Sequence, residues 1–189
     1  MQPIRNFENI QPSSGDFARP GAGGYICRII NATDHPVDPR TGKGDYLKIE
    51  YDIHEGEFKD YYSEAYKKFG KWWASFICSY KEKALGMFRH RINCIEESNV
   101  GYKWNFDEKT LQGKMIGLVI GEEEYLKQSG EVGTRLYVAD VKTVDQIDRG
   151  DYKVPALKKL APNAYQPAQT TSDVQFPVFD SNEKLPWEL

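Results

Sequence analysis

The sequence is poor in cysteine and histidine, with three of each among 189 residues, and it contains no C-x-x-C pair. Cys27, Cys78 and Cys94 are widely spaced, and an odd count without a secretory leader is typical of free thiols in a reducing cytoplasm. Because no histidine accompanies a cysteine at metal-ligand spacing, we expect no zinc site and no cofactor.

Long apolar runs and the common enzyme motifs are also missing. No run reaches 18 apolar residues, so the sequence predicts no membrane span. The patterns G-x-x-x-x-G-K-[ST], G-x-S-x-G and G-x-G-x-x-G do not occur. We therefore expect a non-catalytic protein rather than an NTPase, a hydrolase or a dinucleotide-binding enzyme.

Charge is distributed unevenly along the chain. Residues 1–160 hold 24 basic and 24 acidic residues, whereas residues 161–189 hold only Lys184 against four acids, so this tail carries the whole net charge of −3. Such a segment cannot bury enough apolar surface to offset its ordering entropy. We predict a flexible arm over residues 1–20, one domain over residues 21–160 and a disordered acidic tail.

Alternating and periodic patterns predict five strands and one helix in the domain. Every second residue of 46–53 is apolar, which is typical of a strand with one buried and one solvent face. Residues 84–95 repeat apolar side chains at helical spacing. The predicted strands are Tyr25–Ile30, Tyr46–Ile53, Phe58–Tyr62, Lys114–Ile120 and Thr134–Val144, and the predicted helix lies within Lys81–Asn99.

This order of elements, with the helix between the third and fourth strands, is that of the OB-fold, a five-stranded Greek-key barrel. We therefore expect a mainly β, OB-like domain whose ligand groove is formed by the second and third strands with the loops 1–2 and 4–5. An α+β sheet capped by the helix is the alternative that the pattern leaves open.

Bases and aromatic residues are most densely interleaved between Tyr61 and Arg91, where seven bases face only two acids. Unpaired nucleic acid offers phosphates and flat base faces, so it is bound by Lys or Arg beside aromatic platforms. Adjacent Trp72 and Trp73 cannot both point inward on a regular strand, so one of them is a candidate platform. Alternatively, these aromatics pack a helical insertion onto the barrel while the lysines face solvent.

Further candidates lie on the predicted strands. Tyr46 and Lys48 are predicted on the solvent face of the second strand, and Arg135 and Tyr137 share one face of the fifth strand. In this hypothesis the bases neutralise phosphates and the aromatics stack nucleobases. The predicted DNA contacts are Tyr46, Lys48, Tyr62, Lys67, Lys68, Lys71, Trp72, Trp73, Tyr80, Lys81, Lys83, Arg135 and Tyr137.

Acidic clusters support two competing hypotheses. Glu122-Glu123-Glu124 falls in a predicted hairpin loop over residues 121–133 and would repel phosphate. With Glu96 and Glu97 it leaves open a metal-dependent nuclease. The near-neutral domain also leaves open a protein–protein interaction scaffold that binds no DNA, since many nucleic-acid-binding domains are more basic.

Several stretches resemble one family of bacteriophage and prophage proteins: GDYLKIEYDIHEGEFKDYY, the IEESN helix end followed by VGYKW, GKMIGLVIGEEEY and KVPALKKL. The family is described only as a domain of unknown function, and its members belong to replication and recombination modules. The resemblance spans residues 24–160 and implies an OB-like single-stranded-DNA-binding protein in the cytoplasm of a bacterial host. Small phage proteins of this kind often dimerise, so a homodimer stays open.

The tail resembles the acidic C-terminal tips of bacterial and phage single-stranded-DNA-binding proteins, which end in Pro plus an aromatic. Pro186-Trp187 matches that pattern, although two residues follow the Trp and Lys184 interrupts the acids. The resemblance implies recruitment of a helicase, primase, polymerase or recombinase, and an acidic tail would also compete with DNA for the basic surface. The predicted partner-binding residues are Asp180, Glu183, Leu185, Pro186 and Trp187.

Overall fold

The computed structural model describes residues 19–160. The predicted tail, and the predicted arm apart from Arg19 and Pro20, lie outside the described residues. Two short 3₁₀ turns, Glu82–Ala84 and Glu108–Leu111, accompany the main elements. These elements are β1 (Gly23–His35), β2 (Tyr46–Ile53), α1 (Tyr61–Phe69), β3 (Ser75–Ser79), α2 (Leu85–Ser98), β4 (Met115–Leu126), β5 (Val132–Lys142) and α3 (Val144–Asp148).

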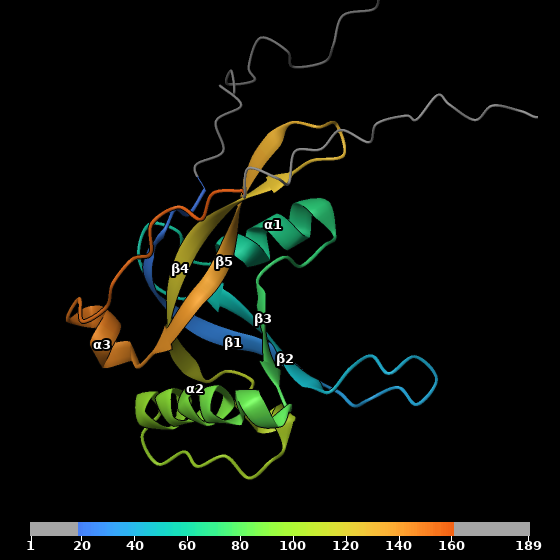
Figure 1. Ribbon diagram of the computed structural model, residues 1–189. Coiled ribbons are helices and arrows are strands. Elements are labelled where there is room, and N and C mark those ends of the chain that lie inside the picture. Colours follow the sequence, from blue (N-terminus) through green and yellow to red (C-terminus); the bar gives the residue numbers. More distant parts are fainter. Residues whose placement is uncertain (1–18, 161–189) are drawn as a thin grey trace, which may run out of the picture.

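The five strands form one antiparallel sheet in the order β3-β2-β1-β4-β5 (Figure 1). The central strand β1 pairs with β4 over Gly23–Arg28 and with β2 over Cys27–His35, and its register shifts between Ile29 and Asn31. Within residues 19–160 no ladder joins the edge strands β3 and β5, so the sheet is open rather than a closed barrel. The fold is therefore mixed α/β, with one main helix, α2, between β3 and β4.

The predicted alternation of β2 is confirmed in the core. Leu47, Ile49, Tyr51 and Ile53 are each at most 3% exposed. Each such side chain contributes about 1.5–3 kcal/mol through the area it removes from water. One residue of the opposite face departs from the prediction, because Asp52 is also buried, at 1% exposure.

The predicted third strand, Phe58–Tyr62, is wrong. Phe58 and Lys59 belong to a turn, and α1 begins at Tyr61. Asp60 has a left-handed backbone with φ +56°, which an extended strand does not allow. The third strand of the sheet is instead Ser75–Ser79, inside residues 63–80, where the sequence predicts no strand.

The helix predicted within Lys81–Asn99 is confirmed as α2, which begins at Leu85 after a 3₁₀ turn. Ile92 and Ile95 are buried, as the helical spacing predicts, whereas Leu85 remains 46% exposed. Asn99 joins the end of this helix to β4, because its side chain accepts from the backbone N–H of Met115 and donates to the Met115 carbonyl oxygen.

The predicted acidic hairpin loop is largely strand. β4 continues to Leu126 and β5 starts at Val132, so the acids 122–124 belong to the β4–β5 ladder. Basic partners make this arrangement favourable, because Glu123 accepts from Arg135 at 2.7 Å and from Lys158 at 3.3 Å. After α3 the chain returns along β4 and bridges it at Glu123 and Lys158.

Figure 1 shows α1 and α2 at opposite ends of β3, so the two helices present separate surfaces. No helix in residues 19–160 is long and apolar enough to cross a membrane.

Candidate nucleic-acid interface

Exposed aromatic and basic side chains gather on α1 and the loop that follows it. Tyr66, Phe69 and Trp73 are 50%, 62% and 50% exposed, although large aromatic side chains are usually buried. The helix ends at Gly70, whose left-handed backbone lets its N–H donate to the Tyr66 carbonyl oxygen. We name the following set the α1 surface: Tyr66, Lys67, Lys68, Phe69, Lys71 and Trp73.

A buried carboxylate on β2 anchors the start of α1. The side chain of Asp52 accepts hydrogen bonds from the backbone N–H groups of Ile53, Tyr62 and Ser63, each at 2.9 Å, and from the Ser63 hydroxyl. The first N–H groups of a helix have no partner inside it, and they favour a negative charge. Asp52 satisfies two of them from the sheet, and so it sets the position of α1 against the core.

The two adjacent tryptophans lie in different environments. Trp72 is half-buried, and its Nε1–H donates to the Ala74 carbonyl oxygen at 2.9 Å. Trp73 points to the surface, with its ring centroid 5.5 Å from that of Phe69 at an angle of 45°. Of the predicted pair, Trp73 is therefore the available platform, and Phe69 extends it.

The lysines of the α1 surface are exposed to solvent. Lys67 and Lys68 occupy the last turn of α1, where the helix dipole favours positive charge. Lys67 also pairs with Glu64 at 2.7 Å. Hydrogen bonding and charge attraction between these two raise the pKa of Lys67 and lower that of Glu64. Lys67, Lys68 and Lys71 therefore bring three positive charges to one small area, where Lys67 is paired with Glu64.

The prediction that Tyr62 stacks a base is wrong, because the structure buries it. Tyr62 is 8% exposed, and its ring meets that of Tyr51 edge-on with centroids 5.7 Å apart. Burial, the largest cause, raises the pKa of the Tyr62 hydroxyl well above its usual value. Tyr62 therefore belongs to the core beneath α1 rather than to a binding surface.

The remaining candidates on β2 and at the end of β3 do not join the α1 surface. Tyr46 stacks on His35 with ring centroids 4.8 Å apart, and Lys48 pairs with Glu50 at 2.6 Å. Tyr80 follows the far end of β3 and donates its hydroxyl to Asp34 at 2.7 Å. The exposed Lys81 and Lys83 follow Tyr80 along the chain.

The candidates on β5 lie on the other edge of the sheet. Arg135 pairs with Glu123 and lies over the Tyr125 ring at 5.6 Å. The Tyr137 ring has Lys158 at 5.9 Å from its centroid. Both residues are already engaged with neighbours, and β3 and β5 share no ladder.

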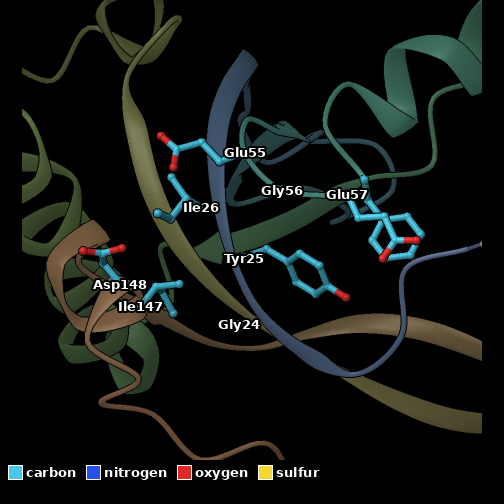
Figure 2. A pocket seen from close by; sticks show the side chains of 9 residues that line it. Gly24, Tyr25, Ile26, Glu55, Gly56, Glu57, Ile147 and Asp148 are labelled. Carbon is cyan, nitrogen blue, oxygen red and sulfur yellow. The ribbon is translucent and has the colours of Figure 1, made fainter.

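An acidic pocket lies between β1, the β2–α1 loop and α3 (Figure 2). Its volume is about 450 Å³, and nine described residues line it. Glu55, Glu57 and Asp148 are among these, and no base is. Tyr25 forms an aromatic part of its wall, and its hydroxyl donates to the Gly21 carbonyl oxygen. This concentration of carboxylates repels phosphate, so the pocket does not suit nucleic acid.

Four of the five acids considered for a nuclease, all except Glu97, have a hydrogen-bond or ion-pair partner within residues 19–160. Glu96 accepts from the Lys103 ammonium at 2.9 Å and from the Trp104 backbone N–H at 3.1 Å, and these bonds lower its pKa. Glu122 lies 3.6 Å from Arg19. Within residues 19–160 no group of three or more His, Cys, Asp or Glu side chains is placed to hold a metal ion.

Sequence reasoning missed three residues that define this interface. Tyr66 and Phe69 repeat at helical spacing just before Gly70, a helix-ending signal that was available in the sequence. Asp52 gave no such signal, since strand alternation places it on the solvent face. Its role appears only when α1 is folded against β2.

No model of a known protein family matches this sequence, and no curated protein matches it. The resemblance to phage replication proteins therefore stays a prediction.

Proposed function

We propose that the protein is a non-catalytic single-stranded-DNA-binding protein that works in phage replication or recombination. The observation that supports this proposal is the α1 surface, where Phe69 and Trp73 are exposed beside Lys67, Lys68 and Lys71. Aromatic rings stack on any base, and lysines release the counterions that phosphates condense. An unpaired strand presents both groups together.

The finer fold assignment is part of the same proposal. The sheet order with two unjoined edge strands is compatible with a partly open OB-like barrel. In this arrangement bound DNA runs from the α1 surface along the edge strand β3. Ile77 on this strand is 52% exposed and offers the bound DNA an apolar contact along β3.

Fluorescence anisotropy of labelled oligo-dT over a series of NaCl concentrations tests the proposal. The slope of log affinity against log salt is about −0.7 for each phosphate neutralised on a single strand. Replacing Lys67, Lys68 and Lys71 with Gln should therefore flatten the slope by about 2. Lys109→Gln, an exposed lysine in another region, is the control and should leave the slope unchanged.

The stacking part of the proposal has its own test. Loss of a stacked base costs about 1–3 kcal/mol, so Trp73→Ala should weaken oligo-dT binding at least fivefold. Phe69→Ala should act in the same direction. Phe106→Ala removes a ring near α2 that is more exposed than Trp73, 82% against 50%, and should have no effect on oligo-dT binding. Unchanged affinity for the Trp73 variant would contradict the proposal.

The tail adds a partner-recruiting function. Its acids and the Leu185, Pro186 and Trp187 tip would bind a replication or recombination enzyme and compete with DNA for the α1 surface. A chain that ends at residue 160 should bind oligo-dT more tightly at low salt. Equal affinity of the two chains would remove the competition but not the DNA binding.

A scaffold without DNA binding is the second candidate, because the acidic pocket gathers Glu55, Glu57 and Asp148 with no base among its described lining residues. In that case the exposed rings of the α1 surface would contact another protein. Oligo-dT would then leave the Trp fluorescence unchanged at both low and high salt.

A further inference from the structure

A second group of aromatic residues lies at the opposite end of β3, against α2. Four rings follow one another, with centroid distances of 5.7 Å from Tyr80 to Phe88, 5.5 Å from Phe88 to Trp104 and 4.8 Å from Trp104 to Phe106. They line a pocket of about 320 Å³ together with Asp34, Leu47 and Glu108. We call it the Trp104 pocket.

Phe106 is in an unusual state for a phenylalanine. Its side chain is 82% exposed, and its backbone is left-handed with φ +68°. That conformation costs a non-glycine residue about 1–2 kcal/mol. The loop is held in place, because the Trp104 N–H donates to Glu96 and the Trp104 indole donates to the Asp107 carbonyl oxygen. Strain and exposure at one aromatic residue of a pocket indicate a binding role.

The charge of the pocket is negative. In residues 19–160 neither Asp34 nor Glu108 forms an ion pair, whereas Glu50 and Glu64 pair with nearby lysines. The one side-chain hydrogen bond that Asp34 accepts here comes from the Tyr80 hydroxyl, and burial and this bond raise the pKa of Tyr80. Lys81 and Lys109 follow two lining residues in sequence, but they do not line the pocket.

Within residues 19–160, the rings of the pocket also have no Arg or Lys placed over them. Elsewhere in the described part, Phe76, Tyr102, Tyr125 and Tyr137 each have an Arg or Lys over the ring. No such contact occurs at Tyr80, Phe88, Trp104 or Phe106 in residues 19–160. Electron-rich ring faces beside two unpaired carboxylates attract a positive group and repel a phosphate.

We propose that the Trp104 pocket binds an arginine side chain of a partner polypeptide. A guanidinium group is planar and stacks on aromatic faces while its N–H groups pair with carboxylates. Leu85, which is 46% exposed and lies three residues before Phe88 on α2, adds apolar surface beside Phe88 for the residues flanking the arginine. This inference does not depend on DNA binding, because it concerns the opposite end of β3.

A matched pair of peptides tests the proposal. Citrulline has the size and shape of arginine without its charge, so Ac-Gly-Leu-Arg-Leu-Gly-NH₂ is compared with its citrulline counterpart. Both are titrated into the full chain while the indole N–H signal of Trp104 is followed by NMR. The arginine peptide should shift this signal saturably and bind at least fivefold more tightly than the citrulline peptide. Equal binding, or no shift by either peptide, would overturn the proposal.

Variants separate this site from the α1 surface. Phe106→Ala and Glu108→Gln should each lower the affinity for the arginine peptide about threefold to tenfold. Phe69→Ala, which removes an exposed ring of the α1 surface, should leave the affinity for the arginine peptide unchanged. The amide spectrum of each variant shows whether it is folded, and Glu108→Gln provides the test if the Phe106 variant is not. A shift of the Trp104 signal by oligo-dT that competes with the peptide would make the pocket a nucleobase site and overturn the proposal.

Discussion

Replacing Asp52 with Asn tests the physical account of how α1 is held. The substitution keeps the shape of the side chain and removes its charge. In the wild-type chain one carboxylate oxygen accepts from Ile53 N–H and Tyr62 N–H, and the other accepts from the N–H and hydroxyl of Ser63. In the variant the amide NH₂ group would replace the second oxygen and face the Ser63 N–H, donor against donor.

The expected cost follows from these contacts. A hydrogen bond to a charged group contributes about 1.5–3 kcal/mol, and a buried donor left without a partner costs about 1–3 kcal/mol. Part of this is recovered, because the Ser63 hydroxyl can rotate and accept from the new amide. Asp52→Asn should therefore destabilise the fold by about 2–4 kcal/mol. Ser63→Ala removes only the hydroxyl and should cost about 1 kcal/mol.

Urea unfolding of the two variants measures these differences, and hydrogen exchange localises them. The amides of Tyr62 and Ser63 should lose more protection than those of α2, because the carboxylate bonds them directly. The Asp52→Asn variant should also bind oligo-dT more weakly, because the α1 surface depends on an ordered α1. A destabilisation of Asp52→Asn below about 0.5 kcal/mol would refute the assigned role of this carboxylate.

Two further predictions concern acid stability and backbone strain. Hydrogen bonds from Arg135 and then Lys158 lower the pKa of Glu123 below its ordinary value of 4.5. The ionised Glu123 therefore stabilises the fold fully above pH 4.5, and this stabilisation is lost as the pH falls through the lowered pKa. Urea midpoints between pH 7 and pH 3 should therefore fall less steeply for Glu123→Gln than for the wild type, and equal slopes would contradict this. Phe106→Gly should be about 1 kcal/mol more stable than Phe106→Ala, because only glycine relieves the left-handed backbone; equal urea midpoints would show that Phe106 is unstrained.

The elements that were predictable are those whose residues repeat at a constant spacing. The alternation of β2 places Leu47 and Ile49 in the core, and the helical spacing of α2 places Ile92 and Ile95 there. The spacing of the apolar residues matches their burial, because each of these elements packs one face against the core. The strand ends were less predictable. Three consecutive acids at 122–124 are typical of a loop, and the bases that stabilise Glu123 within the strand, Arg135 and Lys158, are distant in the sequence.

The candidate site was predictable as a composition but not as a geometry. The excess of lysines and aromatics around Trp72 and Trp73 predicts a basic aromatic region. It does not reveal that Tyr62 is enclosed while Phe69 is exposed, because both lie on the same short helix. That distinction depends on which side of α1 meets Tyr51 of the sheet.

By itself, the sequence determined the helix and most strands of the domain, the apolar core and the presence of lysines beside aromatic rings, because these depend on local spacing and residue type. Only the tertiary structure decided that the sheet stays open, that Asp52 binds the start of α1, and that Asp34 and Glu108 meet four rings at the far end of β3. Such contacts join residues far apart in the chain, and their energies depend on burial and orientation that no local pattern encodes.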